Sequence, residues 1–388
     1  MTSPSSRPAT SSIAVVGAGC FGAWTAHHLA RAGGDVTLVD AHGPANSRAS
    51  SGGHTRLIRM GYGSEEIYTR WSLDSLQQWK ALAERTSSTL FHQTGVLWLA
   101  RAADPLAAAT LATLERVGVA HERLVQPQLA ARWPQVVFDA GDSAILEPHS
   151  GVLMARRAVR VLVGDLVGRG VRYLPAAARP PAAADGRVDS IETLDGRTCR
   201  GATFVFACGP WLPALFPDLL GDRIFTSRQE VLYFGCPAGD LRFTSAALPA
   251  WIEFGAEIYG VPDIDGRGFK VSVDRHGPTF DPETGSRVAG ETLPEARAYL
   301  ARRFPALAGA PLVAAEVCQY ENTSNGDFLI DRHPAFDNVW LVGGGSGHGF
   351  KHGPAVGEYA ARLILEGAAP DDRFRLAAKQ PVQQRTVF

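Results

Sequence analysis

The chain has 388 residues, of which 45% are hydrophobic and 20% charged, a composition typical of a globular protein with about two domains. Its formal net charge of −1 provides no basic surface for nucleic acid or for an anionic membrane. No stretch approaches the ~18 consecutive apolar residues of a membrane-spanning helix. We therefore expect neither a nucleic-acid partner nor a membrane partner.

The first residues and the cysteines indicate the cellular compartment of the protein. Residues 1–12 are rich in Ser, Pro and Thr and lack the apolar core of a secretory signal, so we expect a disordered leader. The chain has five cysteines, an odd number, and no pair has CxxC spacing. This pattern argues against a disulfide framework and against a zinc site, and it favours a cytoplasmic location.

A βαβ unit is predicted directly after the leader. The apolar run 13–16 is expected to be a strand, residues 23–31 a helix with small residues on one face, and residues 36–39 a second strand. Between the first strand and the helix stand Gly17, Gly19 and Gly22 in GxGxxG spacing, and Asp40 ends the second strand. This combination predicts a dinucleotide site.

Each residue of this motif has a physical role. Gly17 allows the tight turn, Gly19 allows the backbone to approach a pyrophosphate, and Gly22 allows the helix to pack closely on the strand. Asp40 can accept a hydrogen bond from a ribose 2′-hydroxyl. The motif does not choose between NAD and FAD, but its position at the start of the chain favours FAD. An NAD-dependent enzyme is the alternative.

Later segments supply further elements. Residues 203–211 and 339–342 are predicted strands, and the second leads into the glycine-rich run 343–351 and a helix over 353–366. Residues 293–304 are predicted to form a helix, with Thr292 as a candidate N-cap and Glu295 completing a capping box. Alternating or aromatic runs predict an antiparallel sheet. The antiparallel runs are 231–234, 250–254 and 269–273.

The sequence resembles the monomeric sarcosine oxidase family of flavin amine oxidases, which includes N-methyltryptophan, pipecolate and fructosyl amino acid oxidases. The resemblance covers nearly the whole chain. It rests on the glycine turn and on segments 51–59 (SGGHTRLIR), 94–97 (TGVL), 147–153 (EPHSGVL), 268–270 (GFK), 318–320 (CQY), 327–331 (DFLID) and 346–351 (SGHGFK). Two positions depart from the family pattern: Gly52 stands where histidine is common, and His54 where an acid is common.

The resemblance implies an α/β protein in which a Rossmann-type FAD-binding domain is interleaved with an α+β substrate domain built on an antiparallel sheet. The FAD-binding domain is expected to be discontinuous, over residues 1–87, 141–223 and 318–388. The substrate domain is expected over 88–140 and 224–317.

The resemblance also implies residues that hold FAD. Cys318 aligns with the cysteine that forms a thioether to the flavin ring, so a covalent cofactor is expected. The other expected cofactor-binding residues, besides the glycine turn and Asp40, are Ser50, Thr55, Gly209, Gly345, Gly347, Gly349 and Phe350.

Most of the expected substrate and catalytic residues lie in the same segments; Tyr259 and Trp251 lie outside them and are expected from a looser alignment with the family. Arg59 and Lys351 are expected to bind the substrate carboxylate, because arginine offers a two-point contact and lysine a compact charge. Tyr259 and Trp251 are expected walls of the substrate pocket. Catalytic roles are expected for Arg56, Tyr320, His348 and Lys270, with Lys270 activating oxygen. Only four of the chain's 38 basic residues are lysines, and Lys270 and Lys351 are two of them.

The sequence therefore predicts a cytoplasmic, monomeric, FAD-dependent amine oxidase. It would oxidise a carbon–nitrogen bond of a secondary amino acid or related amine to an imine and reduce O2 to hydrogen peroxide. Oxidation at the α-carbon and at an N-substituent both stay open. The alternatives are a flavin dehydrogenase that passes electrons to another acceptor, and a flavin-binding tailoring subunit without independent turnover.

Overall fold

A computed structural model of the protein describes residues 12–101, 103–182 and 186–384. These residues form two compact units, each assembled from separate stretches of chain. The first unit comprises the described residues within 12–52, 156–225 and 321–384, and the second comprises 53–155 and 226–320. The expected leader lies outside the described residues except for Ser12, which begins strand β1.

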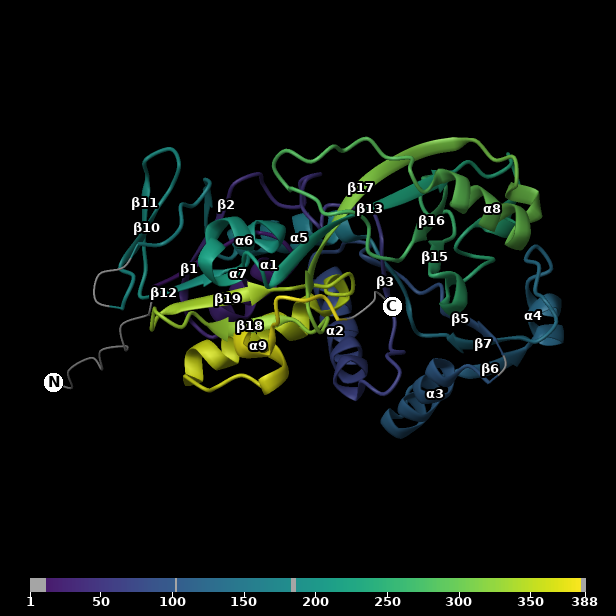
Figure 1. Ribbon diagram of the computed structural model, residues 1–388, viewed down its shortest axis with the longest axis horizontal. Coiled ribbons are helices and arrows are strands. Elements are labelled where there is room, and N and C mark those ends of the chain that lie inside the picture. The colour runs from purple at the N-terminus through teal and green to yellow at the C-terminus, as the bar shows by residue number, and fades with distance from the viewer. Residues whose placement is uncertain (1–11, 102, 183–185, 385–388) are drawn as a thin grey trace. The chain divides into compact units, whose positions relative to one another are not determined.

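A six-stranded sheet in the order β18-β19-β12-β1-β2-β9 forms the centre of the first unit (Figure 1). Neighbouring strands are parallel except β18, which is antiparallel to β19. The central strands read as apolar runs because both faces of a parallel sheet are covered. The strands are β1 Ser12–Val16, β2 Asp35–Asp40, β9 Arg172–Pro175, β12 Thr203–Phe206, β18 Leu329–Arg332 and β19 Val339–Gly343.

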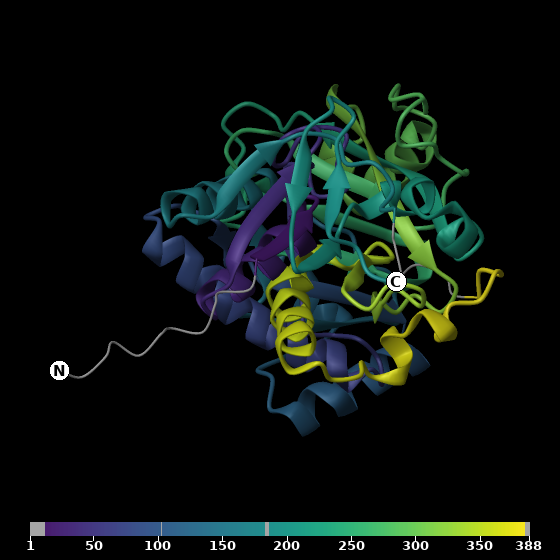
Figure 2. The same cartoon turned by 90° about the vertical axis from the view of Figure 1, so that its left-hand side faces the viewer.

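Two helices of the first unit, α1 (Cys20–Arg31) and α9 (Gly353–Glu366), pack on each other. Figure 2 shows the yellow α9 beside the purple N-terminal segment. Their close approach depends on glycine, because a Cβ at Gly353 would lie 2.4 Å from the Cys20 sulfur. The remaining elements are α5 Ala155–Gly168, α6 Leu212–Leu215, α7 Pro217–Leu220, the hairpin β10 Ser190–Glu192 and β11 Thr198–Arg200, and 3-10 turns at Gly209–Trp211, Phe350–His352, Asp372–Phe374 and Leu376–Ala378.

An eight-stranded sheet in the order β17-β13-β16-β15-β14-β5-β7-β6 forms the second unit's core. Most of its recorded pairings are antiparallel, as expected, but β14 pairs with β5 in parallel. The strands are β5 Val96–Arg101, β6 Glu122–Val125, β7 Asp142–Glu147, β13 Ile224–Phe234, β14 Ala250–Glu253, β15 Ile258–Val261, β16 Phe269–Val273 and β17 Leu312–Thr323. The boundaries between the units fall within β13 and β17.

A small sheet and four helices complete the second unit. The sheet has the order β3-β8-β4, with β3 Arg56–Ile58, β4 Phe91–His92 and β8 Gly151–Leu153. The helices are α2 Glu66–Arg85, α3 Pro105–Val117, α4 Gln126–Arg132 and α8 Leu293–Arg303; a 3-10 turn at Phe254–Ala256 follows β14, and others lie at Leu241–Phe243 and Pro305–Leu307.

The expected capping box at α8 is wrong. The Thr292 side chain does not cap the helix, and Glu295 instead bonds to Arg275. The buried carboxylate of Glu230, from β13, accepts hydrogen bonds from the backbone amides of Gly290 (2.9 Å) and Thr292 (2.9 Å). The Thr292 amide, which the Glu295 side chain was expected to bind, thus donates to a carboxylate from a distant strand.

The expected fold class is confirmed: a Rossmann-type α/β unit is interleaved with an α+β unit whose main sheet is largely antiparallel. The compact units divide the chain differently from the expected domains, since residues 53–87, 141–155 and 318–320 lie in the second unit. The physical reason is that β7 pairs with β5 and β6 in the large sheet, while β3 pairs with β8 and the amides of Met60 and Gly61 donate to Glu147 at the end of β7. Within the described residues, no helix is both long and apolar enough to cross a membrane.

Candidate active site

The glycine turn after β1 is tightly packed at two of its three glycines. Gly17 has a φ of +106°, and a Cβ there would lie 2.3 Å from the Ala207 carbonyl oxygen. A Cβ at Gly22 would lie 1.9 Å from the carbonyl oxygen of Gly17. At Gly19 the nearest contact of a Cβ is the Ser51 hydroxyl at 3.5 Å, so packing does not require glycine there. Gly19 is thus suited to the close backbone approach of a pyrophosphate at the start of α1.

Asp40 ties the end of β2 to this turn. Its Oδ2 accepts a 2.7 Å hydrogen bond from the amide of Ala18, and its Oδ1 accepts a 3.0 Å bond from the amide of His42. Each carboxylate oxygen has a second lone pair that can accept from a ribose hydroxyl. The turn and the carboxylate together fit the adenosine diphosphate half of a dinucleotide.

The glycine-rich segment after β19 packs against the start of α1. A Cβ at Gly349 would lie 2.8 Å from the Phe21 ring and 2.9 Å from the Gly345 Cα. The Phe350 carbonyl lies 3.2 Å from the Cys20 sulfur. Gly347, like Gly209 after β12, has a positive φ. The structure thus brings these expected cofactor-binding glycines to the same unit as the glycine turn; Ser50 belongs to this unit too.

His348 and Lys351 are both buried in this segment. The His348 ring stacks on Phe328 with centroids 4.9 Å apart, and its Nε2 lies 3.0 Å from the Gly326 carbonyl. The Lys351 ammonium donates a 2.9 Å hydrogen bond to the His348 carbonyl. These contacts favour a structural role for His348 over the expected catalytic one, because they hold the backbone that carries Lys351.

A second group of expected residues meets in the second unit, around Arg56. Its guanidinium donates to the Cys318 sulfur at 3.1 Å and to the Thr55 carbonyl at 2.9 Å. A Cβ at Gly53 would lie 2.4 Å from this guanidinium, so glycine there makes room for it. The Thr55 hydroxyl is buried and makes no hydrogen bond within the described residues.

Lys270 is almost completely buried on β16, at 1% exposure. Its ammonium donates a 3.2 Å hydrogen bond to the Thr55 carbonyl and lies 5.0 Å from the centre of the Tyr259 ring. Burial, and next the positive charge of Arg56, lower the pKa of Lys270 from 10.5 to about 7. The side chains of Arg56 and Lys270 thus lie close together, and both donate a hydrogen bond to the Thr55 carbonyl.

Tyr320 and Tyr259 border the same region, together with a carboxylate that the sequence did not indicate. The Tyr320 hydroxyl donates a 3.1 Å hydrogen bond to Oδ1 of Asp274. Burial, and next the charge of Asp274, raise the pKa of Tyr259 to about 12 and hold that of Tyr320 well above its usual value, so both remain protonated donors. Asp274 directly follows the strand of Lys270 in sequence, which was the only available signal.

Arg59 is held between two aromatic rings, at 4% exposure. Its guanidinium carbon lies 4.3 Å from the centre of the Tyr62 ring and 4.6 Å from that of Trp98. Buried Glu147 accepts hydrogen bonds from the Trp98 indole nitrogen (2.7 Å) and the Gly61 amide (2.8 Å). Glu147 therefore fixes both an aromatic neighbour of Arg59 and the backbone beside it. The sequence indicated Glu147 as part of a family segment but not this role.

Trp251 does not fit its expected place in a substrate pocket. It is 2% exposed, stacks on Phe269 with centroids 4.8 Å apart and donates a 3.0 Å hydrogen bond to the Tyr299 hydroxyl. These contacts place it in the core of the second unit. The departure at Gly52 also has a structural basis, because a Cβ there would lie 1.9 Å from the Asn46 carbonyl oxygen.

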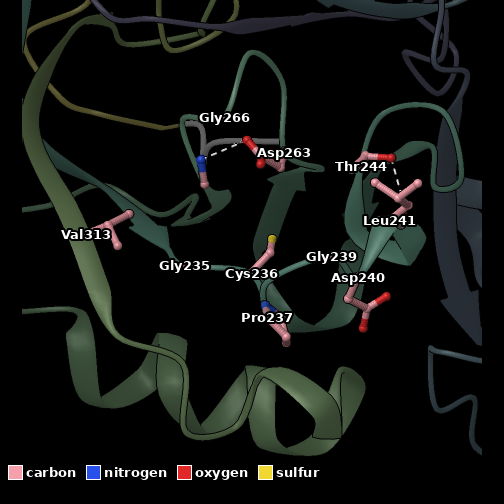
Figure 3. Close-up of a pocket in the computed structure, with 11 residues that line it drawn as sticks. Gly235, Cys236, Pro237, Gly239, Asp240, Leu241, Thr244, Asp263, Gly266 and Val313 are labelled. Atoms are coloured by element: carbon pink, nitrogen blue, oxygen red, sulfur yellow. Dashed lines mark hydrogen bonds between the residues drawn. The ribbon is translucent and has the colours of Figure 1, made fainter.

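A separate pocket of about 360 Å³ lies in the second unit (Figure 3). Its walls include Cys236, Asp240, Asp263 and Val313, and none of the expected site residues lines it. The chemistry indicated by the sequence is thus concentrated elsewhere, in the glycine turn of the first unit and the Arg56 cluster of the second.

Comparisons with known proteins agree with this chemistry. The sequence model of the family described as FAD dependent oxidoreductase matches residues 12–363. Monomeric sarcosine oxidase from Bacillus sp. (strain NS-129) is 31% identical, covering 93% of this chain and 94% of the relative. N-methyl-L-tryptophan oxidase from Citrobacter koseri is 28% identical, covering 92% and 95%. The solved structure of L-proline dehydrogenase from P. horikoshii has a TM-score of 0.82 at 21% identity, covering 95% and 98%, which shows a shared fold.

Proposed function

Because this chain belongs to the family of FAD-dependent oxidoreductases and, within it, to the sarcosine oxidase-like enzymes that act on CH–NH groups, we propose that it oxidises a secondary amino acid or related amine. Bound FAD supplies the redox chemistry, taking a hydride equivalent from the carbon next to nitrogen and passing the electrons to O2 to give hydrogen peroxide. The imine product leaves and hydrolyses. The protein's residues bind, orient and provide charge.

The observation that supports this proposal most strongly is the cluster in the second unit. Arg56, Lys270, Tyr259, Tyr320 and Cys318 come from four separate segments, yet hydrogen bonds and charge interactions link them. Arg56, Lys270, Tyr320 and Cys318 had each been expected at the site from a family segment, and Tyr259 from a looser alignment. A cluster of one buried and one half-buried cation, two protonated tyrosines and a thiol is suited to an anionic reduced cofactor and a small polar substrate.

Substrate binding is assigned to Arg59 and Lys351, through the substrate carboxylate. Arg59 is pre-oriented by its aromatic neighbours, so little side-chain entropy is lost when it binds. Tyr259 and Tyr320 are proposed to border the substrate and to donate hydrogen bonds, since both stay protonated at neutral pH. A neutral amine is the reactive form, because its lone pair supports hydride loss.

Cofactor attachment and oxygen activation are assigned to Cys318 and Lys270. The Cys318 sulfur is the proposed attachment point of the flavin ring, and the Arg56 donor 3.1 Å away can stabilise negative charge on the sulfur before the bond forms. Forming the thioether would release one proton from the sulfur and one from the ring methyl group and would leave two electrons on the flavin, which O2 would accept. The Lys270 ammonium is proposed to stabilise the negative charge that oxygen acquires with its first electron. We also propose that the protein is a cytoplasmic monomer.

A panel of amines scored by peroxide release tests the proposed function. The panel should include sarcosine, other N-methyl amino acids, pipecolate, proline and fructosyl amino acids. Peroxide formed in proportion to amine consumed is the expected result. Anaerobic bleaching of the flavin by an amine without oxygen consumption in air would instead identify a dehydrogenase. A flavin that no amine bleaches would overturn the proposal in favour of a tailoring subunit.

A further inference from the structure

Glu321, on β17, carries a buried carboxyl group that the roles proposed so far leave unexplained. It follows Tyr320 directly, and side chains alternate along a strand, so Glu321 points away from the face shared by Cys318 and Tyr320. The residue is 7% exposed. Its Oε1 accepts a 3.2 Å hydrogen bond from the Gly345 amide, whereas its buried Oε2 has no hydrogen-bond partner within the described residues.

Glycines surround this carboxyl group. A Cβ at Gly343 would lie 3.4 Å from Oε2, one at Gly209 would lie 3.9 Å from Oε2, and one at Gly345 would lie 3.5 Å from Oε1. None of these residues brings a side-chain donor. Burial raises the pKa of Glu321 to about 7, and the amides of Gly345 and Gly344 offset this only in part. A buried acceptor without a donor is unfavourable, so the site is suited to a ligand that supplies one.

The strand order indicates which part of a dinucleotide would meet Glu321. The parallel strands β2, β1, β12 and β19 are neighbours in that order, so their carboxyl ends share one edge of the sheet. Asp40 ends β2, and the glycine turn follows β1. Gly209 follows β12, and Gly343 ends β19. With the adenosine ribose at Asp40 and the pyrophosphate at the turn, the next part of FAD is the ribityl chain, which carries three hydroxyl groups.

We propose that the Glu321 carboxylate accepts a hydrogen bond from a ribityl hydroxyl of FAD and so positions the flavin half of the cofactor. A hydroxyl is the matching group, because it can donate to Oε2, whereas a phosphate oxygen is an anionic acceptor and would be repelled. Glu321 is thus a positioning residue. The inference rests on the proposed function only in taking FAD as the cofactor.

The test measures flavin affinity, not turnover. In a Cys318→Ser background, which keeps the flavin exchangeable, the Kd of FAD and of its 2′-, 3′- and 4′-deoxyribityl analogues is measured by flavin fluorescence. With Glu321 intact, one analogue should bind roughly 10- to 100-fold more weakly than FAD, the usual effect of losing one charge-assisted hydrogen bond. Glu321→Leu should weaken FAD binding by a similar factor and abolish the difference between FAD and that analogue.

Two further variants keep the test decisive. Glu230→Leu removes another buried glutamate, one whose oxygens are both bonded, to backbone amides, the Thr292 hydroxyl and Arg228, and should lower Tm while leaving the FAD-to-analogue ratio unchanged. If Glu321→Leu does not fold, Glu321→Gln keeps the shape and should lower the ratio. An unchanged ratio in the Glu321 variants overturns the inference while FAD binding itself persists. Failure of the protein with Glu321 intact to bind FAD at all would instead overturn the proposed function.

Discussion

The ring of Trp98 lies 4.6 Å from the Arg59 guanidinium carbon, and its indole nitrogen donates a 2.7 Å hydrogen bond to Glu147. One tryptophan therefore couples a buried carboxylate to the proposed carboxylate-binding arginine. A desolvated cation on an aromatic face gains roughly 1–2 kcal/mol. The alignment of Arg59 thus depends on a residue that need not touch the substrate.

Replacing Trp98 should therefore weaken substrate binding more than catalysis. Trp98→Leu is expected to raise KM by about 10-fold, since roughly 1–2 kcal/mol of cation–π stabilisation is lost, with a smaller fall in kcat. Trp98→Phe keeps an aromatic ring beside Arg59, so its KM should lie close to the wild-type value. The matched control is Trp79→Leu, a fully buried tryptophan on α2, which should lower Tm without moving KM. An unchanged KM in Trp98→Leu would refute the coupling.

Removing either proposed carboxylate-binding cation should affect binding and flavin reduction together. Arg59→Ala and Lys351→Ala are each expected to raise KM and slow anaerobic flavin reduction by roughly 10- to 100-fold, the equivalent of about 1.5–3 kcal/mol for a charge-assisted contact. Stopped-flow reduction at low substrate measures this. Lys80→Ala, on α2, is the control. Wild-type reduction rates in both site variants would show that other residues bind the carboxylate.

Lys270 should matter for one half-reaction only. Lys270→Met is expected to slow the reaction of the reduced flavin with oxygen by orders of magnitude, because the stabilising ammonium is gone. Anaerobic reduction by the best amine should change far less. The two half-reactions are measured separately by stopped flow. A wild-type oxygen reaction in the variant would make Lys270 a structural lysine.

The buried ammonium also predicts a pH dependence of stability. The pKa of Lys270 falls from 10.5 to about 7 on folding, so between these values the unfolded flavin-free protein binds more protons than the folded one. The free energy of unfolding should then rise with pH across this window, by at most about 1.4 kcal/mol per pH unit for one proton. Denaturant titrations should show that wild type gains stability relative to Lys270→Met from pH 7 to pH 10. A constant difference would contradict the shifted pKa.

Covalent attachment through Cys318 is directly testable. After acid precipitation, flavin colour should stay in the wild-type pellet and move to the supernatant for Cys318→Ser. Cys236→Ser is a suitable control, because Cys236 lines the separate pocket of Figure 3. Free flavin in the wild-type supernatant would rule out the thioether.

The sequence could predict the features that depend on a few neighbouring residues. The GxGxxG turn constrains its own backbone, and Gly17 makes the expected tight turn with a positive φ. The spacing of Cys318 and Tyr320 put both on one face of a strand, and Asp40 was expected at the end of β2 because strand and acid are adjacent in sequence. Residue-level roles of Lys270, Arg56 and Arg59 came from family segments and stay predictions to be tested.

The sequence by itself thus determined the βαβ unit, because local backbone geometry carries that information, whereas the fold class and FAD followed from the resemblance of its segments to a known family. Only the tertiary structure decided which distant groups meet. Asp274, just after β16, accepts a hydrogen bond from Tyr320 on β17, and Glu230 replaces the expected cap of α8. Trp251 enters the core because it packs on Phe269 and bonds to Tyr299. Likewise, only the tertiary structure shows that Oε2 of Glu321 has no hydrogen-bond partner among the residues described. Whether a buried polar atom finds a partner depends on segments far away in the chain, which no local pattern specifies.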